Sequence, residues 1–518
     1  MLFNSYSFVL VFLPAVIILF HLINKHGHYA AAKMLLLGAS VLFYCCGGLK
    51  AFVILVASLI INYCIFRYLI TAKLDDRLRR LFLCLGIILN IGILIYYKYL
   101  GFFAGVINSL FKTGFPVREV FLPLGISYYT FSQIAFLVDG YREPDNKYSL
   151  PDYALFVTFF PKVSVGPIAT AKDMIPQFND PTRKTVNYDN IAGGIVIFAA
   201  GLAKKVLLAD NLAPYADWGF SHINDLGTVN AVIVMLAYTM QIYFDFSGYC
   251  DMAKAVCLML NLDLPDNFLS PYRAVSVEDF WKRWHMTLTG FFTRYVYIPL
   301  GGNRKGKVRT YVNMFIIFFL SGLWHGAAYT FIAWGLIHGV GISLSKLLKD
   351  KMERLPYKLR CAGTFMFVNV AWIFFRSERL VYAVEFLRQL FSFKFLPVNI
   401  ELVAEATPDE MQFLQWLILT YKGEAPYLSG CVLIIGFLLI ASFISVYCKN
   451  STERLVSLGL TGMEHKTGYV QAGLQETKLP EDQPGLKLSG RTVATTVILL
   501  VLSILSLSGV TEFIYTNF

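Results

Sequence analysis

The sequence predicts an all-α integral membrane protein that crosses the bilayer many times. Two observations carry this prediction. Of the 518 residues, 56% are hydrophobic and only 15% are charged, whereas soluble globular proteins average about 25% charged residues. Apolar windows of the roughly 20 residues that a membrane-spanning helix needs recur along almost the whole chain, and we count about ten to twelve of them.

The expected spans run in order from one end of the chain to the other. They cover 5–23, 34–46, 51–70, 81–100, 152–171, 191–209, 229–246, 312–334, 362–375, 430–447 and 492–511. The first apolar window, Phe8–Ile23, follows a segment without Lys or Arg, so we expect a permanent span and no cleaved signal peptide. Arg77 and Arg80 lie in a short basic loop, and the positive-inside rule makes this loop cytoplasmic and the N-terminus outward-facing.

We interpret the whole chain, 1–518, as one polytopic domain. Gly and Pro interrupt two apolar stretches, 121–131 and 159–168. Irregular backbone at membrane depth survives only where protein buries it or water lines it. These broken helices therefore predict a re-entrant cavity, a feature that transporters share.

The C-terminal part of the chain contains a polar segment and a last apolar one. Residues 449–491 have mixed charge and little periodicity, and we expect a cytoplasmic loop there. Residues 492–518 are expected to form the last transmembrane helix and an extracytoplasmic tail. Lys487 and Arg491 precede this helix and no Lys or Arg follows it, which places its far end outside.

The charge and the cysteines exclude several classes of protein. The net charge is +11, but the basic residues lie in short loops between apolar spans. Membrane topology explains this pattern, so we expect no nucleic-acid partner. The nine cysteines occur mostly singly, and no set of Cys and His has the spacing of a zinc site. We expect neither a disulfide framework nor a metal site.

Polar and aromatic side chains gather in and beside the apolar segments. Ionisable groups are costly to bury in a membrane, so such residues are candidates for function. The catalytic candidates in these segments are His285 and His325. The candidates for substrate or donor binding are Asp245, Asp251, Trp281, Arg283 and Trp324. A contact between helices is the alternative for Asp245 and Asp251, and an anchor at the membrane interface is the alternative for His285. His338 is expected to be structural.

His325 is the leading catalytic candidate. It lies between Trp324 and Gly326 in an apolar run, where few groups can satisfy its ring nitrogens. A desolvated imidazole is neutral at pH 7 and can take a proton from a hydroxyl that attacks an acyl thioester. The chain has no G-x-S-x-G motif, so direct transfer to a hydroxyl is favoured over an acyl-serine intermediate.

A basic loop rich in glycine, 300–310, precedes the span at 312–334 and is expected to be cytoplasmic. Asn303, Arg304 and Lys305 are its candidate donor-binding residues. Cationic side chains can pair with the phosphates of coenzyme A or phosphopantetheine, or with an acidic acyl carrier protein. Anionic headgroups of membrane lipids are an equally good partner for them.

Four motifs between residues 244 and 339 resemble the bacterial membrane-bound O-acyltransferase (MBOAT) family. They are FDFSGYCDMA, NFLSPYRAVSVEDFWKRWHMTLT, YIPLGGNRKG and SGLWHGAAYTFIAWGLIHG. The resemblance covers essentially the whole chain. The chain is similar above all to the alginate and peptidoglycan O-acetylation subunits of this family, and more distantly to the teichoic acid D-alanyl transfer protein. It implies a ring of helices around a transmembrane tunnel, with His325 as the catalytic histidine and His285 as a second characteristic histidine. Thr293 and Arg294 stand where the family leads us to expect an Arg-Asp pair, which leaves the subgroup and the acceptor open.

The resemblance also implies an activity and its partners. The acyl group, expected to be acetyl, would move from a cytosolic thioester donor across the bacterial plasma membrane to an exported polysaccharide or envelope polymer. The donor would be acetyl-CoA or an acyl carrier protein, with no bound cofactor, and an extracytoplasmic SGNH-type transferase would complete the transfer. Two alternatives stay open: D-alanyl transfer to teichoic acid, and a flippase or ion-coupled transporter.

The last six residues, 513–518, read FIYTNF. Phe513, Tyr515 and Phe518 resemble an F-x-Y-x-x-F ending of related O-acylation proteins, in which the tyrosine resembles an acyl relay. On that resemblance Tyr515 would lose its proton to His325, take the acyl group and offer it to the extracytoplasmic transferase. The alternative is that these aromatic side chains anchor the tail at the membrane interface.

Overall fold

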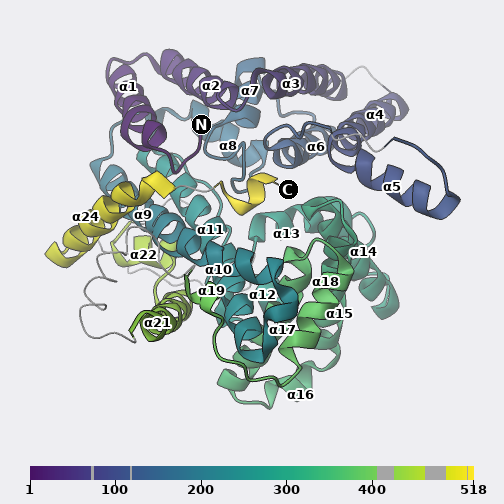
Figure 1. Cartoon of the computed structure of the whole chain (residues 1–518). Helices are drawn as coiled ribbons and strands as arrows, with labels where there is room; N and C mark the ends of the chain where they lie inside the picture. The colour runs from purple at the N-terminus through teal and green to yellow at the C-terminus, as the bar shows by residue number, and fades with distance from the viewer. Residues whose placement is uncertain (72–74, 117–119, 405–424, 461–485, 510–511, 518) are drawn as a thin grey trace.

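The computed structural model describes residues 1–71, 75–116, 120–404, 425–460, 486–509 and 512–517 (Figure 1). These residues form helices and connecting segments, and an isolated bridge between Phe268 and Trp284 is the β pairing among them. Eight of the described helices are long and apolar enough to cross a membrane. They are Ser7–Lys25, Leu49–Leu69, Asp76–Phe111, Tyr188–Ser221, Gly227–Met259, Tyr329–Leu347, Tyr357–Arg376 and Gly430–Tyr447. The predicted all-α, multi-pass fold class is confirmed.

The N-terminal helices lie together on one side of the molecule, at the top of Figure 1. They are α1 (Leu13–Lys25), α2 (Tyr29–Cys45), α3 (Leu49–Leu69), α4 (Asp76–Leu94), α5 (Leu100–Phe111), α6 (Ile126–Arg142), α7 (Leu150–Thr158) and α8 (Ala171–Asn179). The following helices fill the centre and the lower part of that view. They are α9 (Tyr188–Ala203), α10 (Asp210–Ser221), α11 (Gly227–Met259), α12 (Val277–Trp281), α13 (Met286–Phe292), α14 (Lys307–His325), α15 (Tyr329–Leu347), α16 (Lys349–Glu353), α17 (Tyr357–Arg376), α18 (Leu380–Leu390) and α19 (Ile400–Ala404). The last helices are α21 (Ala425–Tyr447), α22 (Ser451–Ser457) and α24 (Gly490–Leu505).

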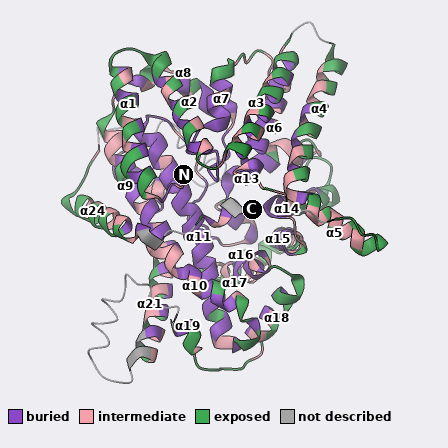
Figure 2. Cartoon of the chain, turned by 45° about the horizontal axis from the view of Figure 1, so that its top comes forward, coloured by how far each residue is buried: buried purple, intermediate pink, exposed green. Residues whose placement is uncertain are grey.

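Helix α11 is the central element of the fold. It is 33 residues long, and 83% of its most apolar window is buried. Figure 2 shows it among other buried segments, while exposed residues are frequent on α5, α18 and α24 at the periphery. A helix that is buried on all sides has no polar face, which is why its apolar residues show no amphipathic pattern. Its interior position allows α11 to hold polar side chains within the protein instead of in lipid.

Two predicted spans are not continuous helices in the structure. Span 152–171 contains α7 only up to Thr158, and residues 159–170 are not helical although most of them are buried, which confirms the break predicted at 159–168. Span 312–334 is split between α14 and α15, because Gly326 adopts an extended conformation with φ −171° and ψ 157°. A Cβ on Gly326 would lie 2.1 Å from a ring carbon of Phe331, so close packing requires glycine at this break.

The C-terminal region also differs from the prediction. Helix α24 has 16 residues, fewer than the predicted span 492–511. Of the predicted polar loop at 449–491, the residues 461–485 lie outside the described residues, and α22 occupies an earlier part of it. The tail forms a short 3₁₀ turn, η10 (Ile514–Asn517), which contacts α11 in the middle of the molecule (Figure 1).

Candidate active site

His325 is the last residue of α14, immediately before the break at Gly326. Its side chain is only 1% exposed. Neither ring nitrogen has a hydrogen-bond partner among the residues that the structure describes. A buried polar atom without a partner costs about 1–3 kcal/mol, so His325 is held at this position by its surroundings and keeps both nitrogens available for a ligand.

Aromatic rings from α14 itself and from four other parts of the chain surround His325. Measured between ring centroids, Trp324 lies 4.9 Å away, Trp334 5.0 Å, Phe375 5.2 Å, Tyr515 5.7 Å and His285 6.3 Å. Trp334 comes from α15, Phe375 from α17, His285 from the segment between α12 and α13, and Tyr515 from the C-terminal tail. The helix break therefore delivers the imidazole to a point where distant segments meet.

Further ring nitrogens of this shell also lack partners. Nε1 of Trp324, Nε1 of Trp334 and Nε2 of His285 are buried and have no hydrogen-bond partner within the described part of the chain. Most buried polar atoms in folded proteins are paired, so a cluster of exceptions requires an explanation. Two N–H donors and two imidazoles around one point are suited to a small polar group such as a carbonyl or a hydroxyl.

His285 is oriented by its neighbours. It precedes α13 in a left-handed conformation with φ 44°, and its ring is fully buried. The oxygen Oδ1 of Asn267 lies 3.1 Å from His285 Nδ1 and also accepts hydrogen bonds from the N–H and the hydroxyl of Thr287. Since Oδ1 can only accept, Nδ1 carries the proton and Nε2 keeps its lone pair. Burial lowers the pKa of His285, so this ring is neutral at pH 7.

Tyr515 lies against both histidines. It is 2% exposed, and its ring centroid is 4.2 Å from that of Phe246 and 6.3 Å from that of His285. The structure thus brings the three predicted catalytic residues, His325, His285 and Tyr515, into one buried cluster.

The other predicted residues have different partners. Asp251 pairs with Lys204 at 2.6 Å, and Arg283 pairs with Asp279 at 2.9 Å. Trp281 donates its indole N–H to Nδ1 of His338 at 3.1 Å. These contacts give each side chain a role in packing, and a role in donor binding stays a prediction. Asp245 pairs with Lys205 and with the backbone of the tail, as described below.

The basic loop lies outside this cluster. Asn303, Arg304 and Lys305 are exposed, and none of them belongs to the aromatic shell of His325. The side chain of Asn313 anchors the loop by donating to the carbonyl of Gly302 at 3.0 Å. Donor binding by this loop stays a prediction.

Lys98 is a residue near the site that the sequence reasoning did not select. It belongs to the π-helical turn between α4 and α5, η2 (Ile95–Tyr99), and its ammonium donates to the carbonyl of Trp324 at 2.5 Å and to Ser127 at 3.1 Å. Tyr99 donates to the carbonyl of Leu323 at 2.6 Å. Both donors satisfy carbonyls at the C-terminal end of α14, where a cation is favourable. The available signal was a lysine within an apolar span.

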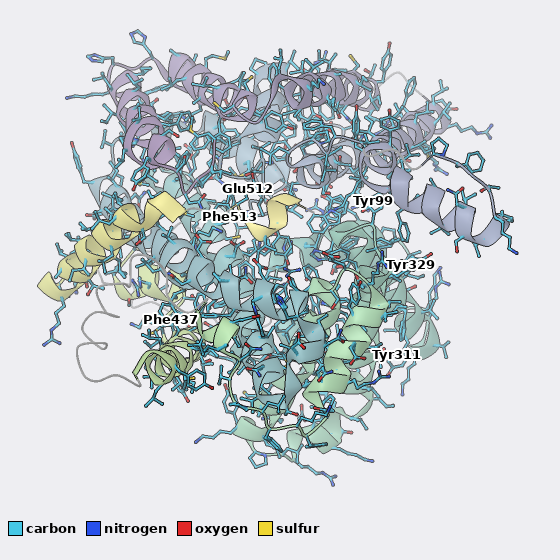
Figure 3. All side chains as sticks on the ribbon, viewed as in Figure 1. Tyr99, Tyr311, Tyr329, Phe437, Glu512 and Phe513 are labelled. Atoms are coloured by element: carbon cyan, nitrogen blue, oxygen red, sulfur yellow. The ribbon has the colours of Figure 1, made fainter. Side chains whose placement is uncertain are left out.

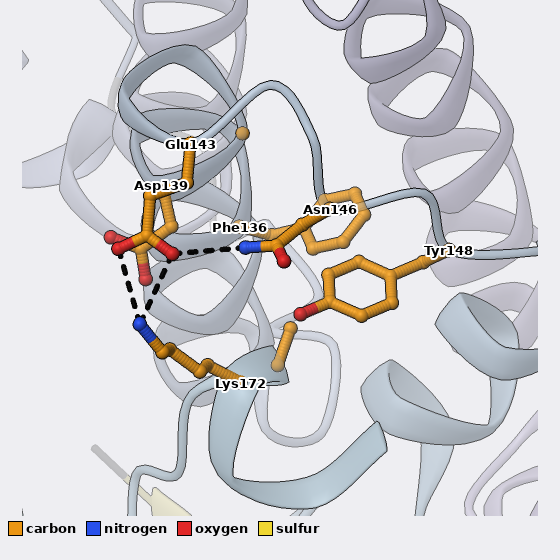
Figure 4. A pocket seen from close by; sticks show the side chains of 8 residues that line it. Phe136, Asp139, Glu143, Asn146, Tyr148 and Lys172 are labelled. Carbon is orange, nitrogen blue, oxygen red and sulfur yellow. Dashed lines mark hydrogen bonds and ion pairs between the residues drawn. The ribbon is translucent and has the colours of Figure 1, made fainter. Parts of the chain in front are cut away.

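A separate pocket is lined by Asp139, Glu143, Tyr148 and Lys172, among others (Figure 4). It shares no residue with the shell of His325. The ammonium of Lys172 bonds both carboxylate oxygens of Glu143 and lowers the pKa of that carboxyl group. Arg294, one of the two residues that stand in place of the expected Arg-Asp pair, donates to Asp139 at 3.0 Å.

Comparison with known proteins agrees with this geometry. Residues 117–384 match the family model described as MBOAT, membrane-bound O-acyltransferase family. The peptidoglycan O-acetyltransferase of Helicobacter pylori is 36% identical over 488 residues, which cover 88% of this chain and 90% of that protein. The Probable alginate O-acetylase AlgI of Pseudomonas aeruginosa is 36% identical over 399 residues, covering 76% of this chain and 75% of that protein. The teichoic acid D-alanyltransferase of Bacillus subtilis is 30% identical over 234 residues, covering 43% of this chain and 59% of that protein.

The family model spans more than half of the chain and includes α14 with His325. The similarity to O-acetyltransferases extends along most of it. An enzyme is thereby favoured over the transporter that broken helices also allow. The chain belongs to the membrane-bound O-acyltransferase family and is an acyltransferase of the membrane.

Proposed function

We propose that this enzyme moves an acetyl group from a cytosolic thioester donor to Tyr515, and from there to a hydroxyl of an exported polysaccharide or envelope polymer. The observation that carries the proposal is the distance of 5.7 Å between the rings of Tyr515 and His325, both of them buried. A hydroxyl placed beside a neutral imidazole is the arrangement that general-base catalysis requires.

The loading step balances without a metal or a cofactor. His325 takes the phenolic proton of Tyr515 while the phenol oxygen attacks the thioester carbonyl. The C–S bond then breaks, and the leaving thiolate receives the proton from the imidazolium to give the free thiol. The product is an aryl acetate on Tyr515, which has a better leaving group than an alkyl ester and stays reactive toward a second nucleophile.

His285 and Trp324 support this step by their positions. The imidazole of His285 packs near Tyr515, and its Nε2 has a lone pair. Nε2 can therefore accept a hydrogen bond from the phenol. The indole N–H groups of Trp324 and Trp334 can donate to the carbonyl oxygen as it becomes negative, as an oxyanion hole does.

The donor and the second nucleophile would come from opposite sides of the membrane. The basic loop with Arg304 and Lys305 is suited to the phosphates of acetyl-CoA or to an acyl carrier protein on the cytosolic side of the bacterial plasma membrane. On the outer side, the nucleophile of an extracytoplasmic SGNH-type transferase would attack the aryl ester, restore the phenol and pass the acetyl group to the polymer. The names of the relatives, a peptidoglycan O-acetyltransferase and alginate O-acetylases, support a polysaccharide acceptor.

Acetyl transfer is favoured over D-alanyl transfer by the extent of similarity. The acetylation relatives align with 88% and 76% of this chain, and the D-alanyltransferase of Bacillus subtilis aligns with 43% of it. D-alanyl transfer from a carrier protein remains the second candidate, because the chemistry at Tyr515 is the same for either acyl group.

The test replaces Tyr515 by phenylalanine, which keeps the aromatic ring and removes the hydroxyl. With isotope-labelled acetyl donor, the native enzyme should give labelled polymer and an acetyl adduct on the C-terminal peptide in mass spectra. Tyr515→Phe should insert normally but give neither product. Tyr382→Phe, which removes a hydroxyl from exposed α18, is the matched control. Normal polymer acetylation by Tyr515→Phe would contradict the relay and leave the tail as an anchor.

A further inference from the structure

The C-terminal tail reaches the active site over a buried ion-pair cluster. Lys205, in the π-helical turn η4 (Lys204–Ala209), is 1% exposed. Its ammonium lies 2.7 Å from Asp245 on α11 and 2.8 Å from Asp210 on α10. Asp245 is 2% exposed. Burying two charges is unfavourable unless the pair is well aligned and its remaining lone pairs and N–H groups are hydrogen-bonded. Here the backbone of the tail provides such hydrogen bonds.

The contacts run from this cluster to the backbone of the tail. Lys205 donates to the carbonyl of Glu512 at 3.2 Å, and Asp245 Oδ2 accepts the backbone N–H of Ile514 at 2.9 Å. The ammonium also lies 4.7 Å from the ring centroid of Phe513. A donor and an acceptor thus grip the chain on both sides of Phe513, at the place that Figure 3 labels.

The next residue after this grip is Tyr515. Phe513 packs against Tyr249 at 5.0 Å, and Tyr515 packs against Phe246 at 4.2 Å, both rings of α11. Asp245 binds the tail backbone and Phe246 packs against the phenol ring. The two residues are adjacent on α11, so one turn of this helix positions both contacts. The grip therefore fixes the distance from the phenol to His325.

We propose that Lys205 and Asp245 form a binding site for the backbone of the C-terminal tail and are positioning residues for Tyr515. This inference rests on the proposed relay, because the cluster would position Tyr515 to receive the acetyl group. The site recognises one carbonyl and one N–H, and these groups do not depend on the side chain at position 514. It predicts that removal of one backbone N–H disturbs docking although every side chain of the cluster remains.

Ile514→Pro is the sharpest variant, because proline has no N–H to donate to Asp245. Ile514 is the first residue of η10, a position that proline tolerates in a helical turn. Ile514→Ala is the matched control: it removes the side chain and keeps the N–H. A hydrogen bond to a charged group is worth about tenfold or more in an equilibrium, so docking should fall by about that factor in Ile514→Pro and stay near normal in Ile514→Ala.

Docking is measured apart from activity by placing p-azidophenylalanine at position 515 of the full-length protein in membranes. Light should cross-link this residue to peptides that contain Phe246, His285 or Phe375, the rings that surround Tyr515. The cross-link should drop about tenfold with Ile514→Pro. It should also drop in the double variant Lys205→Met with Asp245→Leu, which removes both the donor and the acceptor of the grip. The double variant Lys204→Met with Asp251→Asn removes a neighbouring ion pair that has no hydrogen bond to the described tail residues, 512–517, and it should keep the cross-link.

Acetylation is then measured with native Tyr515 present. Ile514→Pro should lower kcat about tenfold and leave KM for the donor unchanged, because the grip binds the tail and not the donor. An unchanged cross-link in Ile514→Pro would overturn the inference, whatever happens to activity. A reduced cross-link with normal acetylation would support the grip and contradict the relay, which distinguishes failure of this inference from failure of the proposed function.

Discussion

At the residue scale, the site depends on what surrounds two imidazoles. His325 and His285 are both buried among aromatic rings, but only His285 has a hydrogen-bond partner among the described residues. Asn267 fixes the tautomer of His285, whereas none of the neighbours that the structure describes fixes that of His325. His325 is the ring that must exchange a proton in the proposed mechanism. Its two nitrogens have no hydrogen bond to the described residues, so either one can take or give the proton.

Replacing His325 by alanine should remove acetylation and leave a folded, membrane-inserted protein. A general base contributes about 10²–10⁴-fold to the rate, and the deleted ring has no hydrogen bond to the described residues whose loss would destabilise the fold. The measurement is acetyl transfer from labelled donor, with thermal unfolding of the purified protein as the control for folding. Wild-type transfer by His325→Ala would exclude the general-base role.

At the element scale, α14 and α15 must pack closely to deliver His325. A Cβ on Gly335 of α15 would lie 2.2 Å from the carbonyl oxygen of Phe318 on α14, and one on Gly322 would lie 2.4 Å from that of Phe331. Glycines at such contacts let two helix backbones approach each other, as in other membrane helix pairs. Lys98 and Tyr99 add a second support by bonding the last carbonyls of α14.

Gly335→Ala should therefore separate α14 from α15 and displace His325. Overpacking of this kind costs about 1–3 kcal/mol, and acetylation should fall more steeply than stability because the imidazole moves with its helix. Gly363→Ala on α17 is the control, since its Cβ would meet nothing within 4 Å. Thermal unfolding and acetyl transfer are measured on both variants. Equal stability and equal acetyl transfer in Gly335→Ala and Gly363→Ala would show that the close contact at Gly335 does not position His325.

At the scale of the whole molecule, the proposed function requires the basic loop and the tail to communicate with opposite sides of the membrane. Arg304 and Glu512 are both exposed and are suitable reporters. In a variant without the nine native cysteines, Arg304→Cys should react with an impermeant maleimide only from the cytosolic side, and Glu512→Cys only from the outside. Labelling of both from the same side would contradict transfer across the membrane. Labelling of Arg304→Cys from outside would also reverse the predicted topology.

The sequence by itself determined the fold class, the family and the identity of the candidate residues. Composition and the recurrence of apolar windows are sufficient to predict an all-α, multi-pass protein. This prediction does not depend on how the helices pack. His325, His285 and Tyr515 were selected because a polar group in an apolar segment, or a family motif, can be read without coordinates. The continuous span predicted at 312–334 was wrong, because hydropathy does not register the backbone break that packing imposes at Gly326. The break inside the span 152–171 was readable from the Gly and Pro residues at 159–168.

The tertiary structure alone decided which of these residues meet. Tyr515 lies 190 positions beyond His325 in the chain, and no periodicity relates the two. Their approach depends on the grip of Lys205 and Asp245 on the tail, and on the support that Lys98 gives to the end of α14. Such contacts join segments far apart in sequence through single hydrogen bonds to backbone atoms. Every residue except proline carries the same backbone N–H and carbonyl groups, so these contacts leave almost no pattern in the sequence.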